Sequence, residues 1–186
     1  MKLGLIGQSV VAVTIAAVAM FCGPVEASES VSIEVGFTPG GSAEALVLKT
    51  LNSARQSIRL IGYSFTSPEV VRALIDAKHR GVDVAVAVDY KSNLKEDRSG
   101  KGRAALSALV NAGIPTRVVL AFPITHDKFF VVDGHTVETG SYNYTTSAAR
   151  YNAENAIVIS GQLDIVRAYL SNWQYVYSKG EDYRGY

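Results

Sequence analysis

THDKFFVVDGHTVETGSYNYTTSAARYNAEN, residues 125–155, is the stretch that decides the fold. Residues 129–132 form a β-branched and aromatic run, which is typical of a strand. Asp133 and Gly134 follow at once, and this pair favours a two-residue hairpin turn, after which residues 136–139 can pair back. The stretch therefore predicts a β-hairpin.

Polar side chains gather at the open end of this hairpin. Because side chains alternate along a strand, we expect His126 and Lys128 on one face. By the same rule Ser141 and Asn143 share a face if the second strand continues past Gly140. An imidazole, an ammonium, a hydroxyl and an amide would then converge, and together these groups could hold one anion.

The spacing of these residues resembles the HxK(x)4D signature of the phospholipase D superfamily. His126, Lys128 and Asp133 match it without a gap, and Gly140-Ser141-x-Asn143 follows as it does in that family. The likeness extends to Gly62-Tyr63-Ser64-Phe65-Thr66, to Glu154-Asn155 and to the C-terminal Asp182-Tyr183-Arg184. It is greatest to the small periplasmic endonucleases that carry a single motif. Other members of the superfamily cut phospholipids, so the resemblance leaves the substrate open.

Upstream of the hairpin, the hydrophobic pattern alternates between strands and helices. The predicted strands are residues 31–37, 57–65 and 82–88, with helices at 43–54 and 68–80 between them. Downstream we expect a helix at 104–112, a strand at 115–121, the hairpin, a strand at 155–159, and a closing helix at 163–177 that buries Ile165, Leu170, Trp173 and Val176. This order predicts an α/β fold with a mixed, largely parallel β-sheet and helices on both faces. The resemblance implies that this is one phospholipase D-like half-unit.

Composition favours one domain after a leader. The chain has 186 residues, of which 48% are hydrophobic and 19% charged, as in an ordinary globular protein. Residues 1–27 have a basic start, an apolar run and a small-residue cleavage site after Ala27, which predicts a signal peptide and a domain at residues 28–186. We therefore expect a periplasmic or secreted protein with no stable membrane association after cleavage. The alternative is a leader retained as an anchor.

Residues 90–103 interrupt the regular pattern. They carry five basic residues against two acidic ones, with serine and glycine between them, and predict a mobile loop. The loop is either an ordinary charged surface segment or a basic flap that follows the phosphates of a nucleic acid.

The resemblance implies that two motifs meet about a two-fold axis to make one active site. This chain contains a single HxK motif, so we expect a homodimer with one active site at its interface. His126 of one subunit would attack phosphorus to give a phosphohistidine, and the second His126 would protonate the leaving oxygen. Since only the singly protonated pair holds both an acid and a base, we expect a bell-shaped pH profile.

The remaining residues of the motif receive supporting roles. Lys128 and Asn143 would hold the non-bridging oxygens, and Ser141 would add a hydroxyl donor. Glu154 would accept a hydrogen bond from the second ring nitrogen of His126. Asp133 belongs to the signature but has the wrong strand parity to face the phosphate, so we expect a structural anchor. The carboxylates form no recognisable ligand set, and no metal or other cofactor is expected.

Other polar and aromatic residues are expected to be structural. His79 and His135 lie outside the motif, and packing is the favoured role for Tyr142 and Tyr144, with stacking on nucleobases as the alternative. Two further residues, Arg150 and Asn152, could lie near the site entrance without an assigned role.

Three functions follow from these observations. The first is a phosphodiesterase that cleaves DNA, with RNA as a further candidate, as a sequence-nonspecific endonuclease. The second is a secreted phospholipase D or phosphatidyl transferase, and the third is a nucleic-acid-binding protein without activity. The formal net charge of +1 is weak for a nucleic-acid binder, so any basic character must be local.

Overall fold

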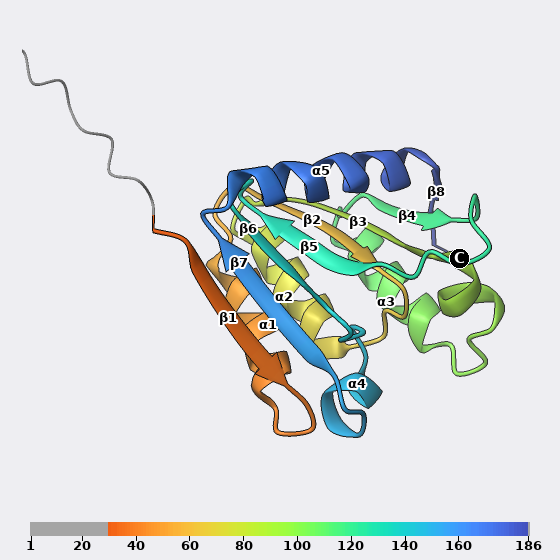
Figure 1. Cartoon of the computed structure of the whole chain (residues 1–186). Coiled ribbons are helices and arrows are strands. Elements are labelled where there is room, and N and C mark those ends of the chain that lie inside the picture. The colour runs from red at the N-terminus through yellow and green to blue at the C-terminus, as the bar shows by residue number, and fades with distance from the viewer. Residues whose placement is uncertain (1–29, 186) are drawn as a thin grey trace, which may run out of the picture.

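The computed structural model describes residues 30–185, and the signal peptide predicted at residues 1–27 lies outside them. One eight-stranded sheet has the order β1-β7-β6-β5-β2-β3-β4-β8 (Figure 1). The strands are β1 (Ser32–Phe37), β2 (Ser57–Gly62), β3 (Asp83–Asp89), β4 (Thr116–Val119), β5 (Lys128–Val132), β6 (Thr136–Gly140), β7 (Asn155–Ser160) and β8 (Gly180–Asp182). The helices are α1 (Ser42–Ser53), α2 (Pro68–His79), the π-helical turn η1 (Lys91–Lys95), α3 (Lys101–Asn111), α4 (Thr146–Arg150) and α5 (Leu163–Ser178).

The sheet is mixed, as expected, but it is not largely parallel. Only the neighbours β2-β3 and β3-β4 run parallel, and the other neighbouring pairs are antiparallel. The expectation of a largely parallel sheet is therefore wrong. A tight turn joins β5 to β6, which forces them to run in opposite directions. The pairing of β1 with β7 joins segments more than 100 positions apart in the sequence, and no local pattern indicates it.

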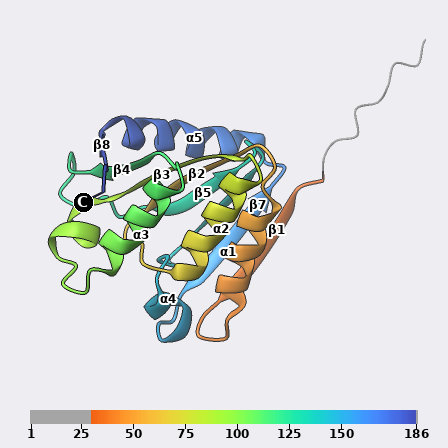
Figure 2. The same cartoon turned by 180° about the vertical axis from the view of Figure 1, so that it is seen from behind.

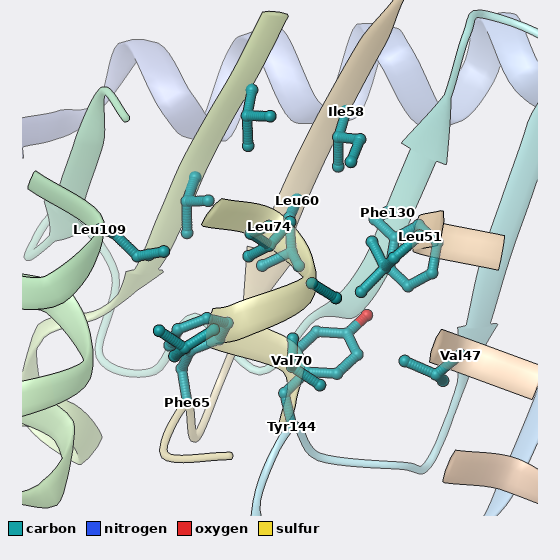
Figure 3. Close-up of a cluster of buried hydrophobic side chains, with 14 of the residues drawn as sticks. Val47, Leu51, Ile58, Leu60, Phe65, Val70, Leu74, Leu109, Phe130 and Tyr144 are labelled. Atoms are coloured by element: carbon teal, nitrogen blue, oxygen red, sulfur yellow. The ribbon is translucent and has the colours of Figure 1, made fainter. Parts of the chain in front are cut away.

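Helices cover both faces of the sheet, which confirms the predicted α/β class. Figure 2 shows α1, α2 and α3 side by side on one face, and α5 crosses the other. The core on the three-helix side is drawn in Figure 3 and contains, among others, Leu51, Ile58, Leu60, Phe65, Val70, Leu74, Leu109, Phe130 and Tyr144. Among residues 30–185, no helix is both long enough and apolar enough to cross a bilayer.

Helix α5 contacts the opposite face through Val166, Trp173 and Val176. The indole nitrogen of Trp173 donates a hydrogen bond to the Leu60 carbonyl at 3.2 Å, which fixes the helix on β2. Ile165 was expected to face inward but is 36% exposed, while its neighbour Val166 is 1% exposed. Because one residue shifts a helical wheel by 100°, the first turn faces the core with a different residue than predicted.

The predicted hairpin is confirmed, although its turn is longer than predicted. Val132 lies opposite Thr136, so three residues connect the strands. Asp133 and Gly134 have φ of 54° and 63°, in the left-handed region that aspartate tolerates and glycine favours.

Asp133 is the structural anchor that its parity predicts. Its carboxylate accepts hydrogen bonds from the backbone amides of Arg55, Gln56 and Ser57 at 2.7–2.9 Å. Burial alone would raise the pKa of Asp133, but these amide donors outweigh it and hold the pKa below its usual value. The hairpin turn is thus joined to the start of β2.

The prediction of a loop over the whole of residues 90–103 is wrong at both ends of that range. Its first half is the helical turn η1, and α3 already begins at Lys101. Asn93 is 1% exposed. Its amide accepts from the Phe65 backbone at 2.8 Å and donates to the carbonyls of Tyr63 and Asp89 at 2.6 and 2.7 Å. This buried amide fixes η1 to the ends of β2 and β3.

Candidate active site

The candidate residues lie at the edge of the sheet where β2, β3 and β6 end and β5 and β7 begin (Figure 1). Lys128 is paired with Gly62 at the end of β2. Gly140 is paired with Ala156 near the start of β7. These registers bring the HxK segment, residues 140–143 and Glu154 to one edge, although 28 positions separate His126 from Glu154 in the sequence.

Lys128 and His126 form the centre of this group. The Lys128 side chain is buried, and its ammonium donates to the His126 carbonyl at 2.7 Å. The same ammonium lies 3.3 and 3.4 Å from the two ring nitrogens of His126. Burial lowers the pKa of Lys128, and the carboxylates of Glu154 and Asp127 act against that shift. A buried positive charge therefore lies against the imidazole, as an anion site requires.

Tyr63 is a neighbour of this pair that the sequence pattern did not single out. Its ring centroid lies 4.5 Å from that of His126, and the Lys128 ammonium lies 5.1 Å from the tyrosine centroid. A cation over a ring face is attracted by the ring quadrupole, so Tyr63 helps to hold both groups. The signal was its place near the end of the strand predicted at residues 57–65, since site residues of α/β folds often lie at strand ends.

Asp89 is a second residue that the sequence pattern did not single out. It ends β3, is 1% exposed, and accepts from the Thr125 backbone amide at 2.8 Å and from the Ser92 amide at 2.6 Å. This carboxylate joins the residue before His126 to η1, so the imidazole sits on a segment fixed from two elements.

The side chains of Ser141 and Glu154 are hydrogen-bonded to each other. The Ser141 hydroxyl donates to Glu154 Oε2 at 2.6 Å, and Asn152 Nδ2 donates to Glu154 Oε1 at 2.8 Å. Within residues 30–185 the hydrogen bonds of the Glu154 carboxylate go to these two groups and not to His126 as expected. Glu154 bonds to Ser141 because the backbone at Gly140 passes very close to β7. A Cβ at Gly140 would lie 2.2 Å from the Asn155 carbonyl oxygen, and this close approach turns Ser141 toward β7.

Asn143 lies between two buried tyrosines. Tyr142 and Tyr144 are 1% and 0% exposed, which confirms the packing role predicted for both. The Asn143 side-chain oxygen is buried and has no hydrogen-bond partner among the described residues. The carboxamide is therefore held at the site edge with an unused acceptor.

The other residues considered from the sequence lie away from the His126–Lys128 pair. Asp133 lies at the far end of β5 from Lys128. His79 is exposed at the end of α2, and His135 contacts Thr136 in the hairpin turn. Arg150 is paired with Glu44 at 3.8 Å. Within residues 30–185 no three His, Cys, Asp or Glu side chains come together as a metal-ligand set.

A family model described as "Cardiolipin synthase, PLD-like domain" matches residues 47–176, which include the whole HxK(x)4D segment. The chain belongs to the phospholipase D superfamily. The resemblance to this superfamily that the motif indicated is confirmed, and so is the predicted α/β class. Among curated relatives of this superfamily member, "Phospholipase D" of Rickettsia bellii is 36% identical over 137 residues, 74% of this chain and 65% of that protein. "Mitochondrial cardiolipin hydrolase" of Xenopus laevis is 35% identical over 133 residues, 72% of this chain and 60% of that protein.

Two solved structures share the same fold. Nuc from Salmonella typhimurium, described as a phospholipase D family member, is 44% identical, with a TM-score of 0.80 over 84% of this chain and all of that chain. NucT from Helicobacter pylori matches with a TM-score of 0.69 at 22% identity, covering 83% of this chain and all of that one. The second likeness shows the fold alone, whereas the first extends to the sequence.

Proposed function

We propose that this chain is a phosphodiesterase that cleaves nucleic acid through a covalent phosphohistidine. One observation carries the proposal: the His126 imidazole lies against the buried Lys128 ammonium, at an edge where the Ser141 hydroxyl and Asn143 carboxamide also lie. An imidazole can attack phosphorus, and a fixed cation can stabilise the charge that grows on the non-bridging oxygens.

The reaction needs a second imidazole, and we propose that a second copy of the chain supplies it. His126 of one subunit attacks phosphorus, the phosphohistidine P–N bond forms, and the bond to the leaving oxygen breaks. The second His126 gives its proton to that oxygen. It then takes a proton from water, and the water oxygen displaces the histidine from phosphorus. One imidazole cannot fill both roles in one step.

An apolar face that no helix of residues 30–185 covers supports the proposed dimer. On β1 the side chains of Ile33, Val35 and Phe37 are 60%, 53% and 60% exposed. Helix α5 crosses the same side of the sheet over β2 to β6 and leaves β1 and β7 bare in Figure 1. Phe37 pairs with Asn155, directly after Glu154, so the apolar face adjoins the proposed site. A second copy packed there would cover apolar surface and bring its own site close.

Nucleic acid is the substrate that we favour, because the surface near the proposed site carries lysines and aromatic rings. Lys91, Lys95, Tyr90 and Phe122 line a cavity of about 240 Å³. Asp89 also lines it and accepts a hydrogen bond from the backbone amide of Thr125, the residue before His126. Ammonium groups can bind phosphates that flank the cleaved one, and aromatic rings can stack on bases.

The alternative substrate is a phospholipid head group, because the curated relatives are named phospholipase D and cardiolipin hydrolase. Both substrates present a phosphodiester to the same imidazole. The exposed β1 face would then meet a bilayer in place of a second subunit.

One experiment separates these functions. Purified protein is incubated with plasmid, single-stranded DNA, RNA, and vesicles of phosphatidylcholine or cardiolipin, each with and without EDTA. We expect cleavage of DNA that is nonspecific in sequence and survives the chelator. Release of head groups with intact nucleic acids would favour the phospholipase, and rescue by Mg²⁺ after EDTA would contradict the metal-independent reaction.

We also propose that the mature enzyme is periplasmic or secreted, with the leader removed after Ala27. Cell fractionation and mass spectrometry of the mature N-terminus test this. An intact leader in the membrane fraction would contradict it.

A further inference from the structure

Glu138 is a carboxylic acid in the middle of an apolar core. It lies on β6 opposite Phe130 on β5 and Val158 on β7, which are 0% and 4% exposed. Glu138 itself is 1% exposed. Burial of a carboxyl group among such neighbours is costly, and the proposed chemistry at His126 makes no direct use of it. A group kept at that cost is a candidate for a specific role.

Its hydrogen bond leads to the catalytic edge. The Tyr144 hydroxyl donates to Glu138 Oε2 at 2.8 Å. Figure 3 shows the Tyr144 hydroxyl directed into the buried cluster that includes Phe130. At its backbone, the Tyr144 carbonyl accepts from the amides of Thr66 and Ser67 at 2.8 and 2.9 Å. Tyr144 is therefore fixed at both ends, by Glu138 inside the core and by the segment that follows β2.

Asn143 depends on this anchor for its position. With Tyr142 and Tyr144 both buried, the side chain between them is directed away from the core by the alternation of an extended chain. An isolated β-bridge pairs Tyr144 with Phe65, in the segment that follows β2. If Tyr144 moved, the carboxamide of Asn143 would move with it.

We propose that Glu138, as a neutral acid, is a positioning residue that holds Asn143 at the active site through Tyr144. This inference rests on the proposed phosphodiesterase function. The neutral form fits the site because Tyr144 supplies one hydrogen bond, whereas a carboxylate in an apolar core needs several donors or water. Ionisation would draw water to Glu138 and disturb its hydrogen bond to Tyr144, and with it residues 141–144, where the chain leaves β6.

The charges around Glu138 agree with a neutral acid. Burial raises the pKa of Glu138 to about 8, against the lowering effect of the Tyr144 hydrogen bond. Burial also raises the pKa of Tyr142, and the other charged groups that act on that tyrosine are Glu44 on α1, Glu138, Glu69 on α2 and Arg150 on α4. These charged groups act on Tyr142, and burial is the cause that favours the protonated form of Glu138.

The test compares Glu138→Gln, which keeps the shape and an acceptor but cannot ionise, with Glu138→Leu, which removes the hydrogen bond. On a small phosphodiester at pH 7, we expect Glu138→Gln to match the wild type and Glu138→Leu to lose at least about tenfold in kcat with little change in KM. The kcat ratio of Glu138→Gln to wild type should rise roughly fivefold from pH 8 to pH 9, since about a tenth of the acid stays protonated one unit above its pKa. A pH dependence that the two proteins share cancels in this ratio. Wild-type kcat in a folded Glu138→Leu protein, or a flat ratio, would overturn the proposal.

A second readout does not depend on activity. The side-chain amide resonances of Asn143 should shift in Glu138→Leu and in Tyr144→Phe, which keeps the core filled if the leucine variant does not fold. They should also shift in the wild type between pH 7 and pH 9, but not in Glu138→Gln. Unchanged resonances in Tyr144→Phe would overturn the proposal. An inactive wild type whose resonances shift as described would instead count against the phosphodiesterase function alone.

Discussion

The Asp133 carboxylate accepts hydrogen bonds from the backbone amides of Arg55, Gln56 and Ser57, so we expect its removal to weaken the fold and leave the chemistry intact. For Asp133→Ala, we predict a loss of about 2 kcal/mol in the free energy of unfolding, because partly buried donors lose a charged acceptor. Urea unfolding at pH 7 measures this loss. The kcat of the folded variant should stay within about twofold of the wild type.

The pH dependence of the Asp133 effect has a definite sign. The pKa of Asp133 is lowered in the folded protein, so its contribution is present above the unfolded value near 3.8 and lost as the pH falls through the folded pKa. The stability gap between wild type and Asp133→Ala should therefore narrow in acid, and the cost of alanine at a φ of 54° remains. Asp133→Asn is the matched control, since asparagine keeps one oxygen acceptor and tolerates the φ of 54°. A kcat collapse in Asp133→Asn would show a role in the reaction.

The motif residues could be found from the sequence because their spacing is local. His126 and Lys128 lie two positions apart on one strand, and strand alternation alone puts them on the same face. The partners of Glu154 could not be predicted in this way, because they depend on how closely Gly140 approaches Asn155. Asp89 was missed for the same reason, since its bond to Thr125 joins residues 36 positions apart.

At the level of elements, the sequence predicted most helices and strands but not how they join. The hydrophobic period located α1, α2 and β3 to within a few residues. It could not show that β1 pairs with β7, because that register joins Ile33 to Ile159 across most of the chain. The composition of η1 is typical of a surface loop, so the sequence predicted a loop there. The segment is instead fixed by one buried side-chain amide, that of Asn93.

The fixed position of η1 leads to a prediction about substrate binding. If Lys91 and Lys95 contact phosphates next to the cleaved one, Lys91→Ala with Lys95→Ala should weaken DNA binding and lower the salt slope of log K by about 2. The kcat on a small phosphodiester should not change, since the substrate does not reach η1. Binding isotherms at several salt concentrations measure the slope.

The control for this prediction is Lys49→Ala, a substitution of an exposed lysine on α1 that is paired with Glu34. It should leave the salt slope unchanged. An equal fall in slope for Lys49→Ala would show that bulk charge, and not the surface of η1, governs binding.

At the level of the whole molecule, the apolar face of β1 predicts where the subunits of the proposed dimer would meet. We expect Ile33→Glu to give a folded monomer with little activity, because a charge on that face opposes burial against a second copy. Ser32→Glu on the same strand is the matched control, since its side chain alternates to the opposite side of the sheet. Light scattering and activity measure the two outcomes. A dimeric, active Ile33→Glu protein would place the interface elsewhere. If Ile33→Glu is a stable monomer that loses only the release of phospholipid head groups, the result would favour contact of the β1 face with a membrane.

Subunit exchange tests whether one site needs both copies of His126. When wild type is mixed with excess His126→Ala protein, random pairing converts nearly all wild-type chains into heterodimers with a single imidazole. Such a pair has either an attacker or a proton donor but not both, so total activity should fall toward zero although the amount of wild-type chain is unchanged. The control is the same mixture made with the His126→Ala chain that also carries Ile33→Glu, which should not join the dimer and should leave the activity intact. Activity that stays constant in the first mixture would mean that each chain completes its own site.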